Sequence, residues 1–372
     1  MHAILAVNAG SSSLKYGLFA LPGLDCLRRG VVERIGQAGG PRDHAAGVAP
    51  LLAAVGDATL DAVGHRVVHG GERFRAPVHV DAAVLHALHE LAALAPVHAA
   101  AELALIEGLA ARCAGVPQVA CFDTAFHATL PRHATLLPIP RRYAARGVRR
   151  YGFHGLSYAY LMSELARLGG AEGRVLLAHL GNGCSLAAVR DGECVDTTMG
   201  FTPAGGLVMG TRSGDLDPGL VAYLARTDGL DAAGFDRLVN AESGLLGLSE
   251  RSSDMRDLLG AADDLPAAEA VAEAVAVFCH QALKHAGAMA AVLGGLDTLV
   301  FAGGIGEHAA PIRARLCAGL AHLGVHLDAA RNDAHAPLVS SPASRVAVRV
   351  IPTDEELQIA RETTALGAAA RA

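Results

Sequence analysis

The N-terminal stretch reads Ala3-Ile-Leu-Ala-Val-Asn-Ala-Gly-Ser-Ser-Ser-Leu-Lys-Tyr-Gly-Leu-Phe19. A short apolar run ends at Asn8, a Gly/Ser cluster follows, and a second apolar run begins at Leu14. Because Gly and Ser favour tight turns, the pattern predicts two strands joined by a turn. Backbone N–H groups in such a turn can bind phosphate oxygens, and Lys15 stands beside it.

The same layout returns later in the chain. Arg174–Leu180 and Ser185–Arg190 read as strands around Gly181-Asn-Gly183, and Leu296–Phe301 reads as a strand that runs into Gly303-Gly-Ile-Gly306. One Gly-rich turn after a strand is commonly structural, but three of them favour phosphate binding. Since a strand, a turn and a strand open both halves, we also expect a duplicated fold, although no stretch of letters repeats.

Apolar periodicity and Gly/Pro punctuation predict the remaining elements. Further strands are expected at Ala62–Val68, Val116–Phe122 and Arg345–Ile351, helices at Ala82–Leu94, Ala100–Ala111, Pro266–Gly294 and Asp354–Ala370, and a loop at Gly36–Gly47. Strands that alternate with helices indicate an α/β core. The punctuation near Arg149–Gly155 is typical of a domain boundary.

Composition excludes several classes of protein. The 372 residues are enough for two to three domains, and a chain that is 52% hydrophobic is not disordered. With 4% aromatic residues and a net charge of −6, neither a stacking platform for single strands nor attraction to a polyanion is expected. No apolar run is long enough to span a membrane, and the start does not read as a signal peptide. The 7 Cys, with no C-x-x-C spacing, favour a reduced cytoplasmic protein over a zinc ribbon.

Two nucleotide-binding classes can also be set aside. The chain contains no G-x-x-x-x-G-K-[ST] sequence and lacks the motif set of protein kinases. Gly304-Ile-Gly306-Glu-His-Ala309 matches the dinucleotide fingerprint G-x-G-x-x-A, but too little chain follows it for a dinucleotide-binding domain. A dehydrogenase is therefore disfavoured.

Four polar residues stand in settings that favour a ligand. Arg66 lies in Gly64-His-Arg-Val-Val-His-Gly-Gly71, Asp123 follows an expected strand, His154 precedes Gly155, and Arg212 lies in Met209-Gly-Thr-Arg-Ser-Gly-Asp-Leu-Asp-Pro218. An Arg between Gly and other small residues can reach a ligand without steric cover. Structural ion pairs or solvated loop charges are the alternatives.

Taken together, these motifs resemble those of the acetate kinases. Asn8-Ala-Gly-Ser-Ser-Ser-Leu-Lys-Tyr16 is similar to the opening signature of that family, and Met199-Gly-Phe-Thr-Pro203 with Met209–Pro218 resembles its second. Further matches are Ser252-Ser-Asp-Met-Arg-Asp257, Gly303–Glu307 and Ile351-Pro-Thr-Asp-Glu-Glu-Leu357, so that the resemblance runs from residue 3 to about residue 361.

The resemblance implies an α/β fold of the two-domain actin-like (ribonuclease H-like) duplicated type, with an ATP cleft between the domains. Residues 1–150 would form the N-terminal domain on the acetate side, rejoined by a C-terminal helix at 356–372. Residues 151–355 would form the domain for nucleotide binding and dimerisation. The implied protein is a cytoplasmic homodimer with neither a nucleic-acid nor a membrane partner.

The implied reaction is the reversible, Mg²⁺-dependent, in-line transfer of the ATP γ-phosphoryl group to acetate, which gives acetyl phosphate and ADP. Mn²⁺ could replace Mg²⁺. Because acetate is ionised at pH 7, the reaction needs positioning and cations rather than a base that creates the nucleophile. We therefore expect Asp123, which the family treats as an acid/base, to orient Arg212 and metal-bound water.

The family's other roles carry over position by position. Arg212 and His154 would neutralise the transferring phosphoryl group, Arg66 would bind the acetate carboxylate, and Asn8 and Glu355 would hold the metal. The apolar acetate pocket would comprise Val68, Val97, Phe153 and Pro203. The nucleotide would contact Ser11, Ser13, Lys15, His179, Leu180, Gly181, Asn182, Gly183, Asp254, Met255, Arg256, Gly304, Ile305, Gly306, Glu307 and His308.

The chain departs from the family pattern at several positions. The affected residues are Ala99 and Ala100 (usually Asn-Pro), Leu156, Tyr158, Gly205, Ala302 and His308. His308 bears on the nucleotide contact, and Val97 stands where Leu is common, which would widen the acyl pocket. We expect acetate to be preferred and propionate to be accepted. A propionate kinase of the same family, or an actin-like or chaperone-like ATPase, are the alternatives.

Overall fold

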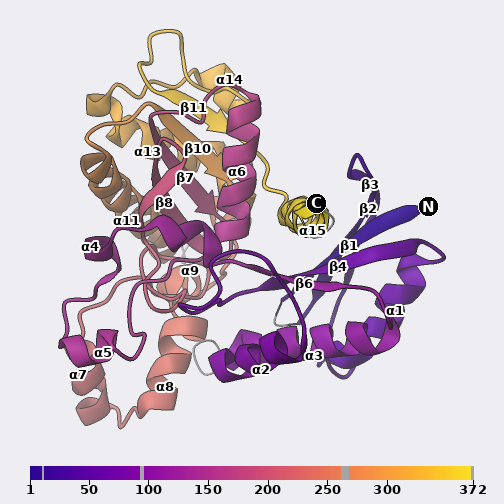
Figure 1. Ribbon diagram of the computed structural model, residues 1–372. Helices are drawn as coiled ribbons and strands as arrows, with labels where there is room; N and C mark the ends of the chain where they lie inside the picture. Colours follow the sequence, from indigo (N-terminus) through magenta and orange to yellow (C-terminus); the bar gives the residue numbers. More distant parts are fainter. Residues whose placement is uncertain (11, 93–95, 261–267, 370–372) are drawn as a thin grey trace. The chain divides into compact units, whose positions relative to one another are not determined.

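The computed structural model describes residues 1–10, 12–92, 96–260 and 268–369, with the backbone alone at 96–98 and 369. The chain divides into two compact units. Unit 1 comprises Met1–Ala128, Phe153–Tyr160 and Asp354–Ala372, and unit 2 comprises Thr129–Gly152 and Leu161–Thr353. Each unit is built on one β-sheet (Figure 1).

The sheet of unit 1 has six strands in the order β3-β2-β1-β4-β6-β5. Their bounds are β1 His2–Ala9, β2 Leu14–Ala20, β3 Asp25–Val32, β4 Thr59–Val67, β5 Val78–His79 and β6 Gln118–Phe122. β1, β2 and β3 form an antiparallel meander, β4 runs parallel to β1, and β6 runs parallel to β4. The short β5 adds an antiparallel edge.

The sheet of unit 2 has five strands in the order β11-β10-β7-β8-β9. Their bounds are β7 Arg174–Leu180, β8 Cys184–Arg190, β9 Glu193–Thr197, β10 Thr298–Ala302 and β11 Ala347–Val350. β7, β8 and β9 again form an antiparallel meander, and β10 and β11 again follow in parallel. The five strands repeat the arrangement β3-β2-β1-β4-β6, which confirms the predicted duplication.

Helices cover both faces of the sheet in unit 1 (Figure 1). Their bounds are α1 His44–Val55, α2 Ala82–Leu91, α3 Pro96–Arg112, the 3₁₀ segment η2 Ala125–Thr129, the start of α6 Gly155–Arg167, and α15 Glu355–Ala369. On one face, β1 side chains such as Leu5 pack with Leu51 of α1 and Leu105 of α3. On the other face, Ile4 packs with Ile359 of α15. The central strands of the sheet are therefore buried between two helical layers, whereas the edge strand β3 is largely exposed.

In unit 2 the longest described helix, α11 Ala268–Leu293, packs on β8 of the sheet and on helix α9. The other helical segments are α4 Arg132–Thr135, α5 Arg141–Ala144, α7 Gly219–Thr227, α8 Ala232–Arg237, η3 Leu238–Glu242, α9 Gly244–Ser249, α10 Met255–Gly260, α12 Gly303–His308, α13 Ala310–Gly319, η4 Ala321–Leu323 and α14 Ala329–Asp333. The buried face of α11 includes Val271, Val275 and Phe278, as its i, i+3, i+4 spacing predicts.

Three local expectations are corrected by the structure. The segment expected to be a loop at 36–47 ends in helix α1, whose first turn is capped by the Asp43 carboxylate accepting from Ala46 N at 2.7 Å. Strands β3, β5 and β9 are additional to those expected. β3 and β9 are partly exposed edge strands that carry charged residues, and β5 has only two residues. The third Gly-rich turn continues as the short helix α12.

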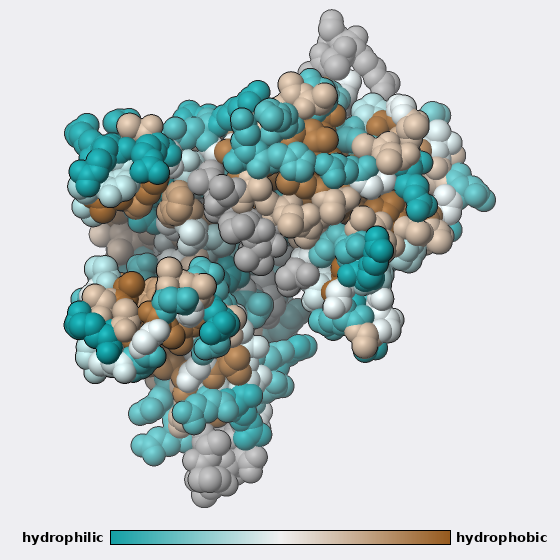
Figure 2. Space-filling view, turned by 90° about the horizontal axis from the view of Figure 1, so that it is seen from below, coloured by the Kyte–Doolittle hydropathy of each residue, from teal (hydrophilic) through white to brown (hydrophobic). Residues whose placement is uncertain are grey.

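Within the described ranges, no helix combines the length and the apolar character that crossing a membrane requires. On the face in Figure 2, hydrophobic residues reach the surface in separate small groups between hydrophilic ones. Such mixing is usual for folded domains, which cannot bury all of their apolar side chains.

Candidate active site

A hydrogen-bonded network in unit 1 joins four of the predicted site residues. Because β4 and β6 pair in parallel up to Val67 opposite Phe122, Arg66 and Asp123 lie at neighbouring strand ends. Arg66 Nε and Nη2 donate to Asp123 Oδ2 at 3.0 and 2.6 Å, and Arg66 Nη1 donates to Asn8 Oδ1 at 3.2 Å. Asn8 Nδ2 donates to Glu355 Oε2 at 2.9 Å. Residues from β1, β4, β6 and α15 thus form one polar cluster.

The cluster is largely removed from solvent, which shapes its electrostatics. The side chains of Arg66 and Asp123 are 16% and 1% exposed. Burial opposes the charge on Arg66, but the carboxylates of Asp123 and Glu355 outweigh it and raise the pKa of the guanidinium. Burial raises the pKa of Glu355 to about 7, Arg66 opposes that shift, and Asp123 adds to it. Asp123 Oδ1 is buried and has no hydrogen-bond partner among the described residues.

These donors fit a magnesium ion. The cluster offers a carboxylate at Glu355, an amide oxygen at Asn8 and the unpartnered Asp123 Oδ1, and a cation would relieve the repulsion between the two carboxylates. The part of the chain that the structure describes contains no group of three or more His, Cys, Asp or Glu residues able to hold a metal ion. An ion here would therefore keep several waters, as Mg²⁺ does in many proteins.

The turn that carries His154 is packed against the end of β6. Gly155 N donates to Asp123 O at 2.9 Å, and a Cβ on Gly155 would overlap that oxygen, so the close approach requires glycine. His154 itself has a left-handed backbone with φ 60°. For a residue other than glycine this conformation is uncommon and is concentrated at functional sites.

Three predicted residues of the acetate pocket belong to unit 1, and the two whose side chains the structure describes are buried. Val68 directly follows β4, and Phe153 precedes the His154 turn. The carbonyl of Phe153 accepts from His127 Nε2 at 2.9 Å, which holds the segment in place. The side chain of Val97, also predicted for this pocket, lies outside the described part of the structure.

The turn between β1 and β2 carries three predicted phosphate contacts. Gly10 N donates to Ser13 O at 2.8 Å, which closes the turn, and Lys15 stands opposite Asn8 in the strand register. The Lys15 side chain is exposed. Ser11 lies outside the residues that the structure describes.

In unit 2 the structure brings Arg212 and Pro203 together. Arg212 Nη1 donates to Pro203 O at 2.7 Å. Met209 N donates to Arg212 O at 3.0 Å, which closes the turn that presents the arginine. Gly244 packs on this turn, and a Cβ there would overlap Met209 O. The Arg212 turn is therefore held by tight backbone packing.

Unit 2 also contains a pocket of about 660 Å³, within the usual range for small-molecule sites. Eight predicted nucleotide-binding residues line it: Gly181, Asn182, Asp254, Met255, Arg256, Gly304, Ile305 and His308. The lining also includes Ser253, Leu259, Ala309 and Pro311, which were not among the predicted nucleotide contacts. Ser253 and Ala309 lie inside the quoted motifs, and a wider window around each motif would also have included Leu259 and Pro311.

Asp254 and Arg256 form an ion pair with each other at 2.6 Å on the lining of this pocket. The Asp254 carboxylate also accepts from Arg256 N at 2.8 Å at the start of α10. Hydrogen bonding to Arg256 lowers the pKa of Asp254, so the carboxylate stays ionised. The pair gives the lining one fixed anion and one fixed cation.

Five predicted nucleotide residues of unit 2 do not line the pocket: His179, Leu180, Gly183, Gly306 and Glu307. Glu307 Oε1 instead accepts from Gly303 N at 2.9 Å and from Thr353 N at 3.2 Å, and so braces the backbone at the start of α12. The Glu307 carboxylate thus stabilises the α12 part of the pocket wall by accepting backbone hydrogen bonds.

A second brace for α12 was not anticipated from the sequence. Arg313 is fully buried, and its Nη1 donates to Gly306 O at 2.9 Å and to Glu307 O at 2.8 Å. Its remaining donors reach Asn332 and His335 on and beside α14. No motif surrounds Arg313, and only the tertiary structure identifies it.

Known proteins share the sequence and the fold of this chain. A family model described as the acetokinase family matches residues 3–361. The chain belongs to the acetokinase family. An acetate kinase of Rhizobium meliloti is 46% identical over 395 residues, covering 98% of this chain and 98% of its own.

Solved structures agree with this assignment. An acetate kinase of Porphyromonas gingivalis matches with a TM-score of 0.90 at 37% identity, covering 98% of this chain and 100% of its own. A propionate kinase of Francisella tularensis matches with a TM-score of 0.90 at 36% identity, covering 97% and 99%. The predicted family and fold class are therefore confirmed, and the chain is a phosphotransferase with a carboxyl group as acceptor.

Proposed function

We propose that this chain catalyses the reversible transfer of the ATP γ-phosphoryl group to acetate, giving acetyl phosphate and ADP. Family membership supports the reaction, and the unused N–H donors of Arg66 support an anionic acceptor. An arginine has five N–H donors, of which the described residues engage three on Arg66. One N–H remains on each terminal nitrogen, which suits two-point binding of a carboxylate.

Acetate is an ionised nucleophile at neutral pH, so the protein's task is to hold two anions together and to stabilise the moving charge. In this proposal Arg66 binds the acetate carboxylate. Asp123, expected from the sequence to orient Arg212, instead orients Arg66 through two hydrogen bonds. Val68, Val97, Phe153 and Pro203 cover the methyl group. Arg212 and His154 neutralise the transferring phosphoryl group.

The nucleotide occupies the pocket of unit 2 in this proposal. Met255, Leu259 and Ile305 provide apolar contact for the base, and the backbone at Gly181 and Gly304 approaches the phosphates. Asn8 and Glu355, with the free oxygen of Asp123, would hold Mg²⁺ or Mn²⁺. The ion supplies charge neutralisation for the phosphates.

The experiment is an acyl phosphate trap. The protein is incubated with ATP, Mg²⁺, hydroxylamine and acetate, propionate or butyrate, and the acyl hydroxamate is measured. Hydroxamate is expected with acetate, and at lower kcat/KM with propionate, because one methylene in an apolar pocket changes kcat/KM by about 10–200-fold. A butyrate optimum would contradict the acetate preference. ATP hydrolysis without any hydroxamate would instead indicate an ATPase of the actin or chaperone type.

We further propose that the chain forms a homodimer through unit 2. α7 has no buried residue, and Val221 and Tyr223 on it are exposed, as is the nearby Leu216. Exposed apolar side chains on one element are typical of an interaction surface. The seven cysteines are all free, which supports a reducing, cytoplasmic location.

A further inference from the structure

The segment that follows β4 cannot continue the sheet hydrogen bonds. Pairing of β4 with β6 ends at Val67, whose carbonyl accepts from Asp123 N at 3.0 Å. Val68, His69, Gly70 and Gly71 are all buried beyond this point. A buried backbone N–H without an acceptor is costly, so this segment needs partners other than a strand.

Side chains supply those partners. Val68 N donates to both carboxylate oxygens of Glu102, at 3.1 and 3.2 Å. Gly70 N donates to Thr124 Oγ1 at 3.0 Å, and Gly71 N donates to His69 Nδ1 at 2.9 Å. The segment is thus fixed to α3, to the end of β6 and to its own turn.

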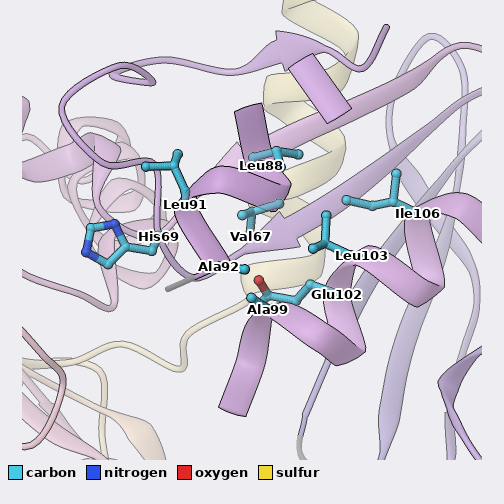
Figure 3. Close-up of a pocket in the computed structure, with 9 residues that line it drawn as sticks. All are labelled: Val67, His69, Leu88, Leu91, Ala92, Ala99, Glu102, Leu103 and Ile106. Atoms are coloured by element: carbon cyan, nitrogen blue, oxygen red, sulfur yellow. The ribbon is translucent and has the colours of Figure 1, made fainter. Parts of the chain in front are cut away.

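Glu102 is the unusual member of this set. It lies on α3, is 4% exposed, and faces a cavity of about 20 Å³, large enough for one water. Figure 3 shows its carboxylate among apolar side chains, with Val67, Ala92 and Ala99 around it. Burial raises the pKa of Glu102 to about 7, although Arg66 and the Val68 N–H oppose the shift, and Asp123 adds to it.

A carboxylate in such surroundings is expensive, and an apolar side chain of the same size would pack there at lower cost. An apolar side chain could not, however, accept a hydrogen bond from the Val68 N–H. Arg66 lies two residues before Val68 and is attracted by the same carboxylate. Glu102 therefore holds the Val68 backbone and attracts the Arg66 guanidinium. These are the two residues at the end of β4 that the proposed function assigns to acetate binding.

We propose that Glu102 is a positioning residue for acyl-group specificity: it fixes the Val68 backbone, and through it the wall of the acetate pocket. This inference rests on the proposed function of the site. Glu102 acts through Val68 rather than on the substrate. Neither composition nor motif spacing pointed to it.

The test compares Glu102→Ala and Glu102→Gln in the hydroxamate assay. The alanine variant is expected to raise the acetate KM about 10-fold, the effect of one lost hydrogen bond to a charged group. kcat and the ATP KM should stay near wild type, and the preference for acetate over propionate should fall. Glu102→Gln keeps an oxygen for Val68 N and should restore most of the acetate affinity.

Glu107 provides the matched control. It lies on the same helix, its side chain is 48% exposed, and it pairs with His89 on the surface. Glu107→Ala should leave the acetate KM and the acyl preference unchanged. Should Glu102→Ala fail to fold, Glu102→Met, which keeps the volume and lacks the acceptor, should show the same rise in acetate KM.

Two results separate this inference from the proposed function. If the wild-type protein forms no acyl hydroxamate, the proposed function fails. If the wild type forms it and the folded Ala or Met variant keeps the wild-type acetate KM and preference, Glu102 is not a positioning residue. A loss of kcat by the same factor for acetate and propionate would likewise overturn the inference, since it indicates a merely structural role.

Discussion

Arg66 shows how a largely buried cation can remain available to an anion. Asp123 and Asn8 engage three of its donors, while Asp123, Glu355 and Glu102 raise its pKa against the effect of burial. The carboxylates hold the guanidinium charged and in one orientation. In the proposed function, a substrate carboxylate would therefore meet a cation that needs little further ordering, which favours affinity.

Arg212 provides the first prediction at the scale of a residue. Arg212→Ala should lower kcat far more than it raises the acetate KM, because in the proposed mechanism its charge acts on the transferring phosphoryl group. Steady-state kinetics with acetate and ATP give both constants. A change confined to the acetate KM would assign Arg212 to uniform substrate binding instead.

His65 provides a prediction on stability and pH. The ring is 1% exposed, Nε2 bonds with Gln118 Oε1 at 2.7 Å, and Nδ1 has no hydrogen-bond partner within the described ranges. Burial lowers the pKa of His65 from 6.5 to about 4, so between these values the unfolded chain binds more protons than the folded one. Stability is therefore complete above pH 6.5 and falls as the pH drops toward 4, by on the order of 3 kcal/mol from this group.

The measurement compares urea unfolding of the wild type and of His65→Gln at pH 7 and pH 5. The variant cannot titrate at this position, so its stability should fall less between the two pH values. Parallel losses in both proteins would show that His65 is not buried in its neutral form.

Candidate residues could be predicted where they lie in motifs with a strict chemical requirement. Arg66, Asp123, Asn8 and Glu355 are far apart in sequence, yet all four meet in one network. Glu102 could not be predicted, since a Glu on an Ala-rich helix normally faces solvent. Its burial depends on where β4 and β6 stop pairing, which is a tertiary property.

At the scale of elements, β4 and α15 are joined by an unusually close approach at Gly64. A Cβ at Gly64 would overlap Thr363 Oγ1, and it would lie 2.6 Å from Ile359 Cγ2. Gly64→Ala should therefore push α15 away from the sheet and lower the free energy of unfolding by about 1–3 kcal/mol, the usual cost of overpacking.

Gly367→Ala is the matched control for that experiment. Gly367 lies on α15 with open space around it, and alanine is the better helix former, so this variant should be slightly more stable than wild type. Urea unfolding measures both variants. Equal stability of Gly64→Ala and wild type would mean that α15 is not packed on β4 as described.

The periodicity of apolar residues predicts a helix or strand correctly where one or both faces of that element are buried. β7 has the predicted bounds, and α11 ends one residue before its predicted end, while its predicted start at Pro266 lies outside the described residues. Helix α1 was not predicted, because Gly47 and Pro50 interrupt the helical pattern, whereas the Asp43 cap and buried Val48 and Leu51 still stabilise a helix.

At the scale of the whole molecule, the proposed homodimer makes a direct prediction. Tyr223→Asp places a charge on the exposed face of α7, and it should shift the protein from dimer to monomer in light scattering after size-exclusion chromatography. Leu168→Asp changes another exposed apolar residue of unit 2 and should leave the dimer intact. A monomeric wild type would contradict the proposal.

The repeat of one strand order in both units was predictable in outline only. Each half opens with a strand, a Gly-rich turn and a strand, and this pattern suggested duplication. The partly exposed edge strands β3 and β9 complete the two meanders, but their charged residues hide the strand signal. The likeness of the units lies in topology, which constrains side chains less than a shared motif does.

The distribution of thiols gives the molecule one preferred site for attaching a thiol-reactive label. Among the seven cysteines, all of which lie in described residues, Cys26 on β3 is exposed, Cys113 is half-buried and the others are buried. Burial raises the pKa of the Cys121 and Cys184 thiols, which slows their alkylation. A maleimide fluorophore should therefore attach first to Cys26 in unit 1, and a second dye introduced in unit 2 would allow energy transfer between the units to be followed as substrates are added.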